Sequence, residues 1–339
     1  MAIDLTTNYL GLCLRNPLVA SASPLTGNVD TLRQLEDAGA AAAVLPSLFE
    51  EQIEHEEREI ARLYEYQTES FAESLTHFPE LENYNTGTGD YLRKVEVAKQ
   101  SVSIPIIGSL NGSTEGGWMR YAKDIEQAGA DALELNIYYV PTNPLLTSAD
   151  VEQRYVDLVA AVRSSISIPL AVKIGPNFSS LPNFAQRLVE AGADGLVLFN
   201  RYLEADIDLE TLQFKPDLVL SDRHEARVPI RWIAIIRDIL PKTCIAATSG
   251  VHRMEGALKL LLAGANVTMM ASALIKFGPQ HLTQILERLE AWLVEHEYDS
   301  VTQLQGSMSH LNCPDPSALV RANYMRTLTS YTWQPPVVE

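Results

Sequence analysis

The chain is poor in cysteine, and its basic residues are far outnumbered by acidic ones. It has 339 residues with only 3 cysteines, and Cys13, Cys244 and Cys313 are too widely separated to form a metal-binding or redox motif. We therefore expect no metal site, and a reduced, cytoplasmic setting. The 43 acidic residues against 26 basic ones give a net charge of −17. This charge argues against nucleic acid and anionic membranes as partners.

Long hydrophobic runs and dinucleotide-binding motifs are also absent. No apolar stretch approaches the roughly 20 residues that span a bilayer, and the first twenty residues have no long apolar core. We expect neither a membrane anchor nor a signal peptide. No Gly-x-Gly-x-x-Gly motif follows the first predicted strand, which weakens the case for a dinucleotide-binding fold.

One short phrase, Ala-Gly-Ala followed by an apolar run, occurs four times. Its glycines are Gly39, Gly129, Gly192 and Gly264. Glycine at such a position is typical of a helix C-terminus that needs positive φ, and the apolar run is typical of a strand buried on both faces. Alternating helices and buried strands predict either a (β/α)8 barrel or a doubly wound sheet.

Eight predicted strands favour the closed barrel. They are Leu18–Ala22, Ala42–Pro46, Pro105–Leu110, Ala132–Asn136, Leu170–Lys173, Gly195–Asn200, Cys244–Ser249 and Val267–Ala271. Helical patterns lie between them, for example at 148–164 and 230–240. We expect one α/β domain over residues 1–339, a (β/α)8 TIM barrel with a short N-terminal β-hairpin over its base.

Two long connections interrupt this pattern, at about 47–100 and 201–228. The first contains a charged helix, Glu50–Glu69, for which a solvated surface position is the simpler interpretation. Long loops on the functional face of a barrel often form lids or binding walls. The tail from about 300 to 339 is expected to be a helical appendage or an oligomer contact, and base rates favour a homodimer.

Polar residues end several of the apolar strands and are expected to project into the barrel mouth. Asn136 and Asn200 could bind a polar, planar molecule by directed hydrogen bonds. Lys173 ends an apolar run, where an unpaired charge is costly to bury. A structural ion pair with Glu134 is the alternative to a functional role for this lysine.

The loops after the last two strands predict an anion site. Ser249 and Gly250 follow the seventh strand, and Ala271 and Ser272 follow the eighth. Small residues there leave backbone N–H groups open, and these two loops form the phosphate site of many barrels. Two tight turns without a ligand are the alternative.

These residues together resemble the dihydroorotate dehydrogenase family of FMN-dependent barrels, from about Asp4 to about Gln305. The resemblance lies in the segments Gly11–Ala22, Glu134–Asn136, Val172–Lys173, Asn200, Ser249–Val251 and Ala263–Ala265. It implies that FMN contacts Ala20, Ser21, Ala22, Asn111 (or its neighbour Ser109), Asn136, Lys173, Asn200, Ser249, Gly250, Ala271 and Ser272. It also implies that a small substrate contacts Asn136, Asn200 and Asn85.

The implied reaction is hydride transfer between flavin N5 and a dihydropyrimidine-like ring, as in the oxidation of dihydroorotate to orotate in pyrimidine biosynthesis. A cation at Lys173 would stabilise anionic reduced flavin and would be catalytic in that sense. The electron acceptor is expected to be soluble, because no membrane-anchoring helix precedes the barrel.

The chain departs from the family where the substrate would bind. The family has a cysteine or serine base after the fourth strand, whereas Tyr139 is nearest that position here, with Tyr138 beside it. Pro46 replaces a lysine that ends the second strand in class 1 members. A tyrosine can act as a proton donor or acceptor when a nearby cation lowers its pKa. Packing of both tyrosines on the loop is the alternative.

Two other functions stay open at this point. One is a flavin-free lyase of a phosphorylated substrate, with Lys173 forming a Schiff base. The other is a diverged flavoprotein that has lost dihydroorotate activity together with the family's base.

Overall fold

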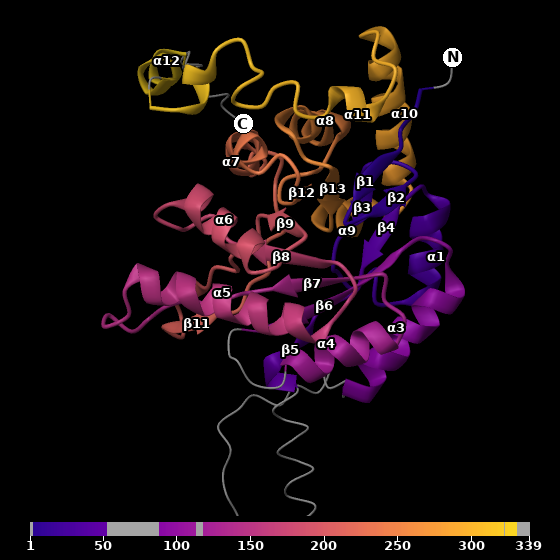
Figure 1. The fold of residues 1–339 in the computed structure, drawn as a ribbon, viewed down its shortest axis with the longest axis vertical. Coiled ribbons are helices and arrows are strands. Elements are labelled where there is room, and N and C mark those ends of the chain that lie inside the picture. Colours follow the sequence, from indigo (N-terminus) through magenta and orange to yellow (C-terminus); the bar gives the residue numbers. More distant parts are fainter. Residues whose placement is uncertain (1–2, 53–87, 113–117, 322, 331–339) are drawn as a thin grey trace, which may run out of the picture.

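Eight parallel strands close into a barrel (Figure 1). They are β3 (Leu18–Ala20), β4 (Ala42–Val44), β6 (Ile106–Asn111), β7 (Ala132–Asn136), β8 (Leu170–Ile174), β9 (Gly195–Leu198), β12 (Cys244–Ala247) and β13 (Val267–Met270). Their order is β4-β3-β13-β12-β9-β8-β7-β6, and the pairing of β4 with β6 closes the ring. The predicted barrel is confirmed, and the doubly wound alternative is wrong.

The computed structural model describes residues 3–52, 88–112, 118–321 and 323–330. Asn85 and most of the predicted helix Glu50–Glu69 lie outside these ranges. A short strand, β5 (Leu48–Phe49), follows β4 and pairs with the end of β6. None of the helices in the described ranges is long and apolar enough to cross a membrane.

Helices surround the barrel on its outside (Figure 1). They are α1 (Val29–Asp37), α3 (Thr88–Ser101), α4 (Trp118–Gln127), α5 (Ser148–Ser165), α6 (Leu181–Glu190), α7 (Arg227–Ile239), α8 (Met254–Ala263) and α10 (His281–Glu295), with a short α9 (Ser272–Phe277) before the last. Gly39, Gly129, Gly192 and Gly264 all have positive φ, between +94° and +124°. The repeated phrase therefore does end helices and begin strands, as predicted.

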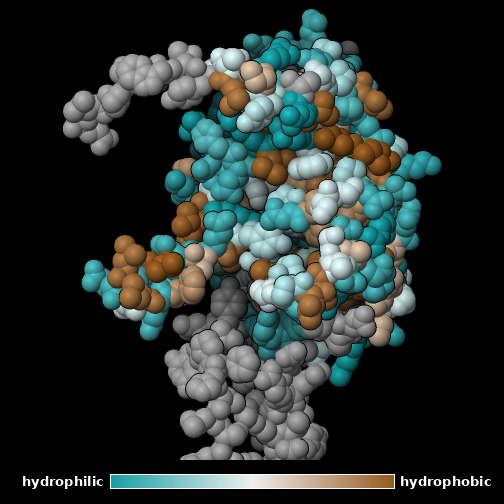
Figure 2. All heavy atoms as spheres, turned by 90° about the vertical axis from the view of Figure 1, so that its left-hand side faces the viewer, coloured by the Kyte–Doolittle hydropathy of each residue, from teal (hydrophilic) through white to brown (hydrophobic). Residues whose placement is uncertain are grey.

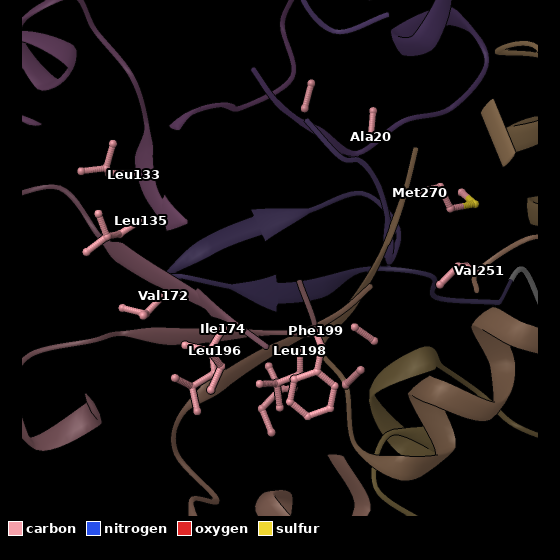
Figure 3. Close-up of a cluster of buried hydrophobic side chains, with 14 of the residues drawn as sticks. Ala20, Leu133, Leu135, Val172, Ile174, Leu196, Leu198, Phe199, Val251 and Met270 are labelled. Atoms are coloured by element: carbon pink, nitrogen blue, oxygen red, sulfur yellow. The ribbon is translucent and has the colours of Figure 1, made fainter. Parts of the chain in front are cut away.

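The side chains of the strands alternate between two separate cores. Outward-facing residues such as Leu135, Val172 and Leu196 pack against the helices, and Figure 3 shows part of this set. The intervening residues face the barrel interior, because successive strand residues point to opposite faces. On β7 and β8 these interior positions include Glu134 and Lys173, both buried.

The N-terminal hairpin of β1 (Thr7–Tyr9) and β2 (Leu12–Leu14) closes the base of the barrel. Tyr9, Leu10 and Leu14 are almost fully buried and pack with interior residues of the strands, including Val197 and Met269. The backbone N–H of Leu10 also donates a hydrogen bond to the sulfur of Cys244 on β12, at 3.2 Å. The predicted N-terminal hairpin is therefore confirmed, and its apolar side chains seal the base.

A second hairpin lies in the connection between β9 and α7, and the sequence did not indicate it. Its strands are β10 (Asp206–Asp208) and β11 (Gln213–Lys215). Ile207, Leu209, Leu212 and Phe214 are each more than half exposed there. Figure 2 shows hydrophobic side chains gathered on a projection on this side of the molecule.

The C-terminal tail is helical, as predicted. It contains α11 (Val301–Leu304), a 3-10 helix (Pro316–Leu319) and α12 (Asn323–Thr329). Its first part is tied to the N-terminus, because the backbone N–H of Val301 donates to the carbonyl of Asp4 at 2.9 Å.

Candidate active site

A cavity of about 1210 Å³ lies at the C-terminal ends of the barrel strands. Ten of the residues predicted for the site line it: Ser21, Ala22, Asn111, Asn136, Lys173, Asn200, Ser249, Gly250, Ala271 and Ser272. Ala20 and Tyr139 are not among the lining residues. Ala20 is instead buried in the outer core, one residue before the cavity wall begins. Asn85 lies outside the described residues.

Three polar residues stand side by side at the ends of neighbouring strands. Asn111 of β6 pairs in register with Asn136 of β7, which in turn pairs with Lys173 of β8. The Asn200 side-chain amide, just after β9, donates a hydrogen bond to Oδ1 of Asn136 at 2.8 Å. Because all four face one cavity, they can present several directed hydrogen-bonding groups to the same planar ligand.

The buried cation of this site is held by a carboxylate beneath it. Lys173 Nζ lies 3.3 Å from Glu134 Oε1, and the two side chains are only 10% and 1% exposed. Glu134 faces the interior one layer below the cavity. Burial raises the pKa of Tyr9 well above its usual range, and the nearby charge of Glu134 adds to this shift. The two interpretations of Lys173 are therefore compatible: it forms a structural ion pair and also lines the cavity.

The loop after β12 has an unusual backbone. Ser249 and Gly250 have φ values of +74° and +75° in succession, and such conformations tend to cluster at functional sites. A Cβ on Gly250 would lie 2.3 Å from the backbone nitrogen of Ala226, at the start of α7. The Ser249 hydroxyl donates to the carbonyl of Phe199 at 3.2 Å. These contacts fix the loop against its neighbours, and its small residues line the cavity.

The two tyrosines after β7 have different surroundings. Tyr138 lines the cavity, and its ring centre lies 5.1 Å from that of Tyr202. Tyr139 packs partly against the outer core, and the guanidinium of Arg154 on α5 lies 4.8 Å from its ring centre. Of the two, only Tyr138 is in position to meet a ligand.

Several further cavity residues were not singled out from the sequence. Tyr91 of α3 donates to the Ser109 carbonyl at 3.0 Å and accepts from its N–H at 2.9 Å, which fixes the end of β6. Arg201 forms an ion pair of 3.0 Å with Glu225 and binds the Val219 carbonyl. Ser221 comes from the same connection, where the stretch Ser221–Glu225 stands in place of a Gly-rich segment of the family that the sequence resembles.

No group of three or more His, Cys, Asp or Glu among the described residues is arranged to hold a metal ion. The polar groups that line the cavity are mainly amides, hydroxyls and backbone atoms, with the cations of Arg93, Lys94, Lys173 and Arg201 and the carboxylates of Glu50, Glu51 and Asp90. This donor set suits an organic ligand with anionic and hydrogen-bonding groups.

Comparison with known proteins gives a consistent result. The family model for dihydroorotate dehydrogenase matches residues 4–293. The catalytic subunit of dihydroorotate dehydrogenase B (NAD(+)) from Thermoplasma acidophilum is 26% identical over 310 residues, which cover 89% of this chain and 98% of that protein.

Two other relatives match over shorter regions. A putative dihydroorotate dehydrogenase A (fumarate) from Aeropyrum pernix is 29% identical over 66% of this chain and 73% of its own length. The Bacillus pumilus catalytic subunit of dihydroorotate dehydrogenase B (NAD(+)) is 32% identical over 60% of this chain and 66% of its own. The match of the family model extends over nearly all the barrel. The chain therefore belongs to the dihydroorotate dehydrogenase family of oxidoreductases, which act on CH–CH bonds.

Proposed function

We propose that the protein is an FMN-dependent dehydrogenase that oxidises dihydroorotate, or a closely similar dihydropyrimidine, to the unsaturated ring. The main support for this proposal is the set of residues that line one cavity. Asn136, Lys173 and Asn200 line it together with the loops of Ser249 and Ser272. A planar heterocycle and a phosphate can therefore bind in the same cavity.

The cavity fits a flavin in both size and chemistry. Pockets for a single drug-sized ligand typically enclose about 300–1,000 Å³, and the 1210 Å³ here leaves room for a cofactor and a small substrate together. Lys173 is a cation suited to the electron-rich edge of a reduced flavin, and the Ser249–Gly250 and Ala271–Ser272 loops would hold the phosphate. When bound, FMN would supply the hydride acceptor at N5.

The chain's own residues would orient the substrate and handle its proton. Asn136 and Asn200 are joined by a hydrogen bond and act as one unit that can fix the ring and its amide groups. Lys173 contributes a positive charge that stays in place through its pairing with Glu134. Tyr138 also lines the cavity and is proposed to accept, as its phenolate, the proton that leaves carbon as hydride departs.

A lyase with Lys173 as Schiff-base nucleophile is less well supported. A nucleophilic lysine needs a free amine, whereas Lys173 is held in a buried ion pair with Glu134. Trapping with borohydride and carbonyl compounds should leave the protein unmodified.

The electron acceptor is proposed to be a soluble molecule. The names of the relatives specify NAD(+) in one case and fumarate in another, so both should be offered to the reduced protein. A homodimer also stays a proposal, and light scattering of the purified protein would test it.

The decisive experiment is an absorbance spectrum followed by anaerobic addition of dihydroorotate. We expect a flavin band that bleaches on addition. A flavin band that stays would keep the cofactor and reject this substrate, as expected of a flavoprotein that has lost the activity. Protein without a flavin band after reconstitution with FMN would reject the proposal altogether.

A further inference from the structure

Three connections of the barrel meet at the end of the cavity where the phosphate is proposed to bind. Ser221 belongs to the connection between β9 and α7, His252 follows β12, and Ser272 follows β13. Ser221 and Ser272 line the cavity, whereas His252 does not. His252 is nevertheless only 8% exposed, so it lies behind the cavity wall.

Hydrogen bonds join these three residues in a chain. His252 Nε2 lies 3.0 Å from the hydroxyl of Ser221. The backbone N–H of Ser221 donates to Oγ of Ser272 at 3.2 Å. On the other side, His281 at the start of α10 donates from Nε2 to the carbonyl of His252 at 2.7 Å. His252 therefore links two parts of the molecule: its carbonyl binds the start of α10, and its imidazole binds the connection between β9 and α7.

The direction of the second hydrogen bond has a chemical consequence. Because Ser272 Oγ accepts the N–H of Ser221, one lone pair of the hydroxyl is occupied and its own proton is free to point elsewhere. Ser272 faces the cavity, so that proton is available to an anionic oxygen there. If Ser221 moved away, the hydroxyl would lose this orientation and would pair with water or backbone instead.

We propose that His252 is a positioning residue for the cofactor phosphate: it holds Ser221 in place, and Ser221 in turn orients the Ser272 hydroxyl toward the phosphate. This inference rests on the proposed function, since it assumes that FMN occupies the cavity. It assigns a role to Ser221 and His252, neither of which belongs to the site predicted from the sequence.

The test compares two flavins that differ only in the phosphate. The full-length chain is titrated with FMN and with riboflavin, for wild type, His252→Ala, Ser221→Ala and the double variant. Each single variant should weaken FMN binding about tenfold, the size expected for one hydrogen bond to a charged group. Riboflavin binding should change less than twofold. The double variant should be no weaker than either single one, because both act through one linkage.

His224→Ala is the matched control. This histidine is exposed in the same connection, three residues beyond Ser221, and does not line the cavity. It should leave both affinities unchanged. Ser221→Ala tests the same linkage if His252→Ala fails to fold, because Ser221 is on a partly exposed loop where the substitution should be tolerated.

Three results would overturn the inference. Equal losses of FMN and riboflavin affinity would show a general structural defect rather than a phosphate effect. Unchanged FMN affinity in both variants would show that the linkage does not matter. Wild-type protein that binds no FMN would remove the proposed function and this inference together, whereas the first two results leave the proposed function intact.

Discussion

The two ends of the barrel interior are built from opposite kinds of residues. At the base, Tyr9, Leu10 and Leu14 of the N-terminal hairpin pack against small and aliphatic side chains. At the mouth, Asn136 and Lys173 occupy the equivalent inward positions of the strands. The strands are continuous between the two ends, so the same backbone supports a closed apolar plug and an open polar site.

The apolar residues that stabilise the fold and the polar residues that line the cavity thus lie at opposite ends of the barrel. A base sealed by apolar burial contributes to folding free energy, and its hairpin residues Tyr9, Leu10 and Leu14 do not line the cavity. A mouth with a buried ion pair and linked amides is less favourable for folding, because charged and polar groups are desolvated there. Substitutions at the two ends should therefore have distinguishable effects.

The largest effect is expected for Lys173→Met. It leaves Glu134 as a buried carboxylate without its partner, a change that typically costs about 3–5 kcal/mol of folding free energy, and it should slow flavin reduction about 10²- to 10³-fold. Urea unfolding and rapid-mixing absorbance measure the two effects. The double variant Glu134→Gln with Lys173→Met should recover much of the stability but none of the rate. A single variant with wild-type rate would contradict a role for the charge.

The next largest effect is expected at the base. Leu14→Ala removes a side chain that is 1% exposed inside the hairpin plug, which should lower the free energy of unfolding by about 2–5 kcal/mol. Flavin affinity and turnover of the folded protein should stay at the wild-type level. Reduced flavin affinity in fully folded Leu14→Ala would show that the two ends are coupled after all.

Tyr138→Phe should slow substrate oxidation about 100-fold, as expected for loss of a proton acceptor. Tyr139→Phe serves as its matched control, because that residue is next in sequence but packs under Arg154. Anaerobic reduction of bound flavin by dihydroorotate is the measurement. A larger loss of reduction rate in Tyr139→Phe than in Tyr138→Phe would show that Tyr139, and not Tyr138, is the catalytic residue.

The smallest effect is a pH dependence at the mouth. Burial, and next the charge of Lys276, lower the pKa of His252 below its ordinary value of 6.5, while Asp222 and Glu225 oppose this shift. The unfolded chain therefore binds the proton at higher pH than the folded one. The contribution of His252 to stability is complete above about pH 6.5 and is lost as pH falls from there through the lower folded pKa. Wild type should lose more thermal stability than His252→Asn between pH 7.5 and 5.5. Equal losses would contradict the assigned shift.

The strands could be predicted because their sequence signals are local. Each glycine of the Ala-Gly-Ala phrase requires positive φ, and the apolar run after it has no alternative to burial. Predicted and observed strands agree within about two residues, and the β7 bounds are identical. The inward direction of Lys173 also follows from local alternation along β8.

Other features depend on contacts that a sequence does not reveal. The β10–β11 hairpin is short and exposed, so burial leaves no pattern in its residues. Tyr138 and Tyr139 are adjacent in an irregular loop, and only the packing of Arg154 and Tyr202 distinguishes them. The linkage of Ser221, His252 and Ser272 joins three connections that are far apart in the chain.

The N-terminal hairpin and the first barrel strand also set an order of events during synthesis. β3 pairs with β13, the Thr7 hydroxyl donates to the carbonyl of Asn266 at 3.0 Å, and Asp4 binds Val301. Residues that are synthesised before most of the barrel strands thus have partners that are synthesised after them. At about 5–20 residues per second, roughly 10 to 50 seconds separate β3 from β13, and the barrel can close only after that interval.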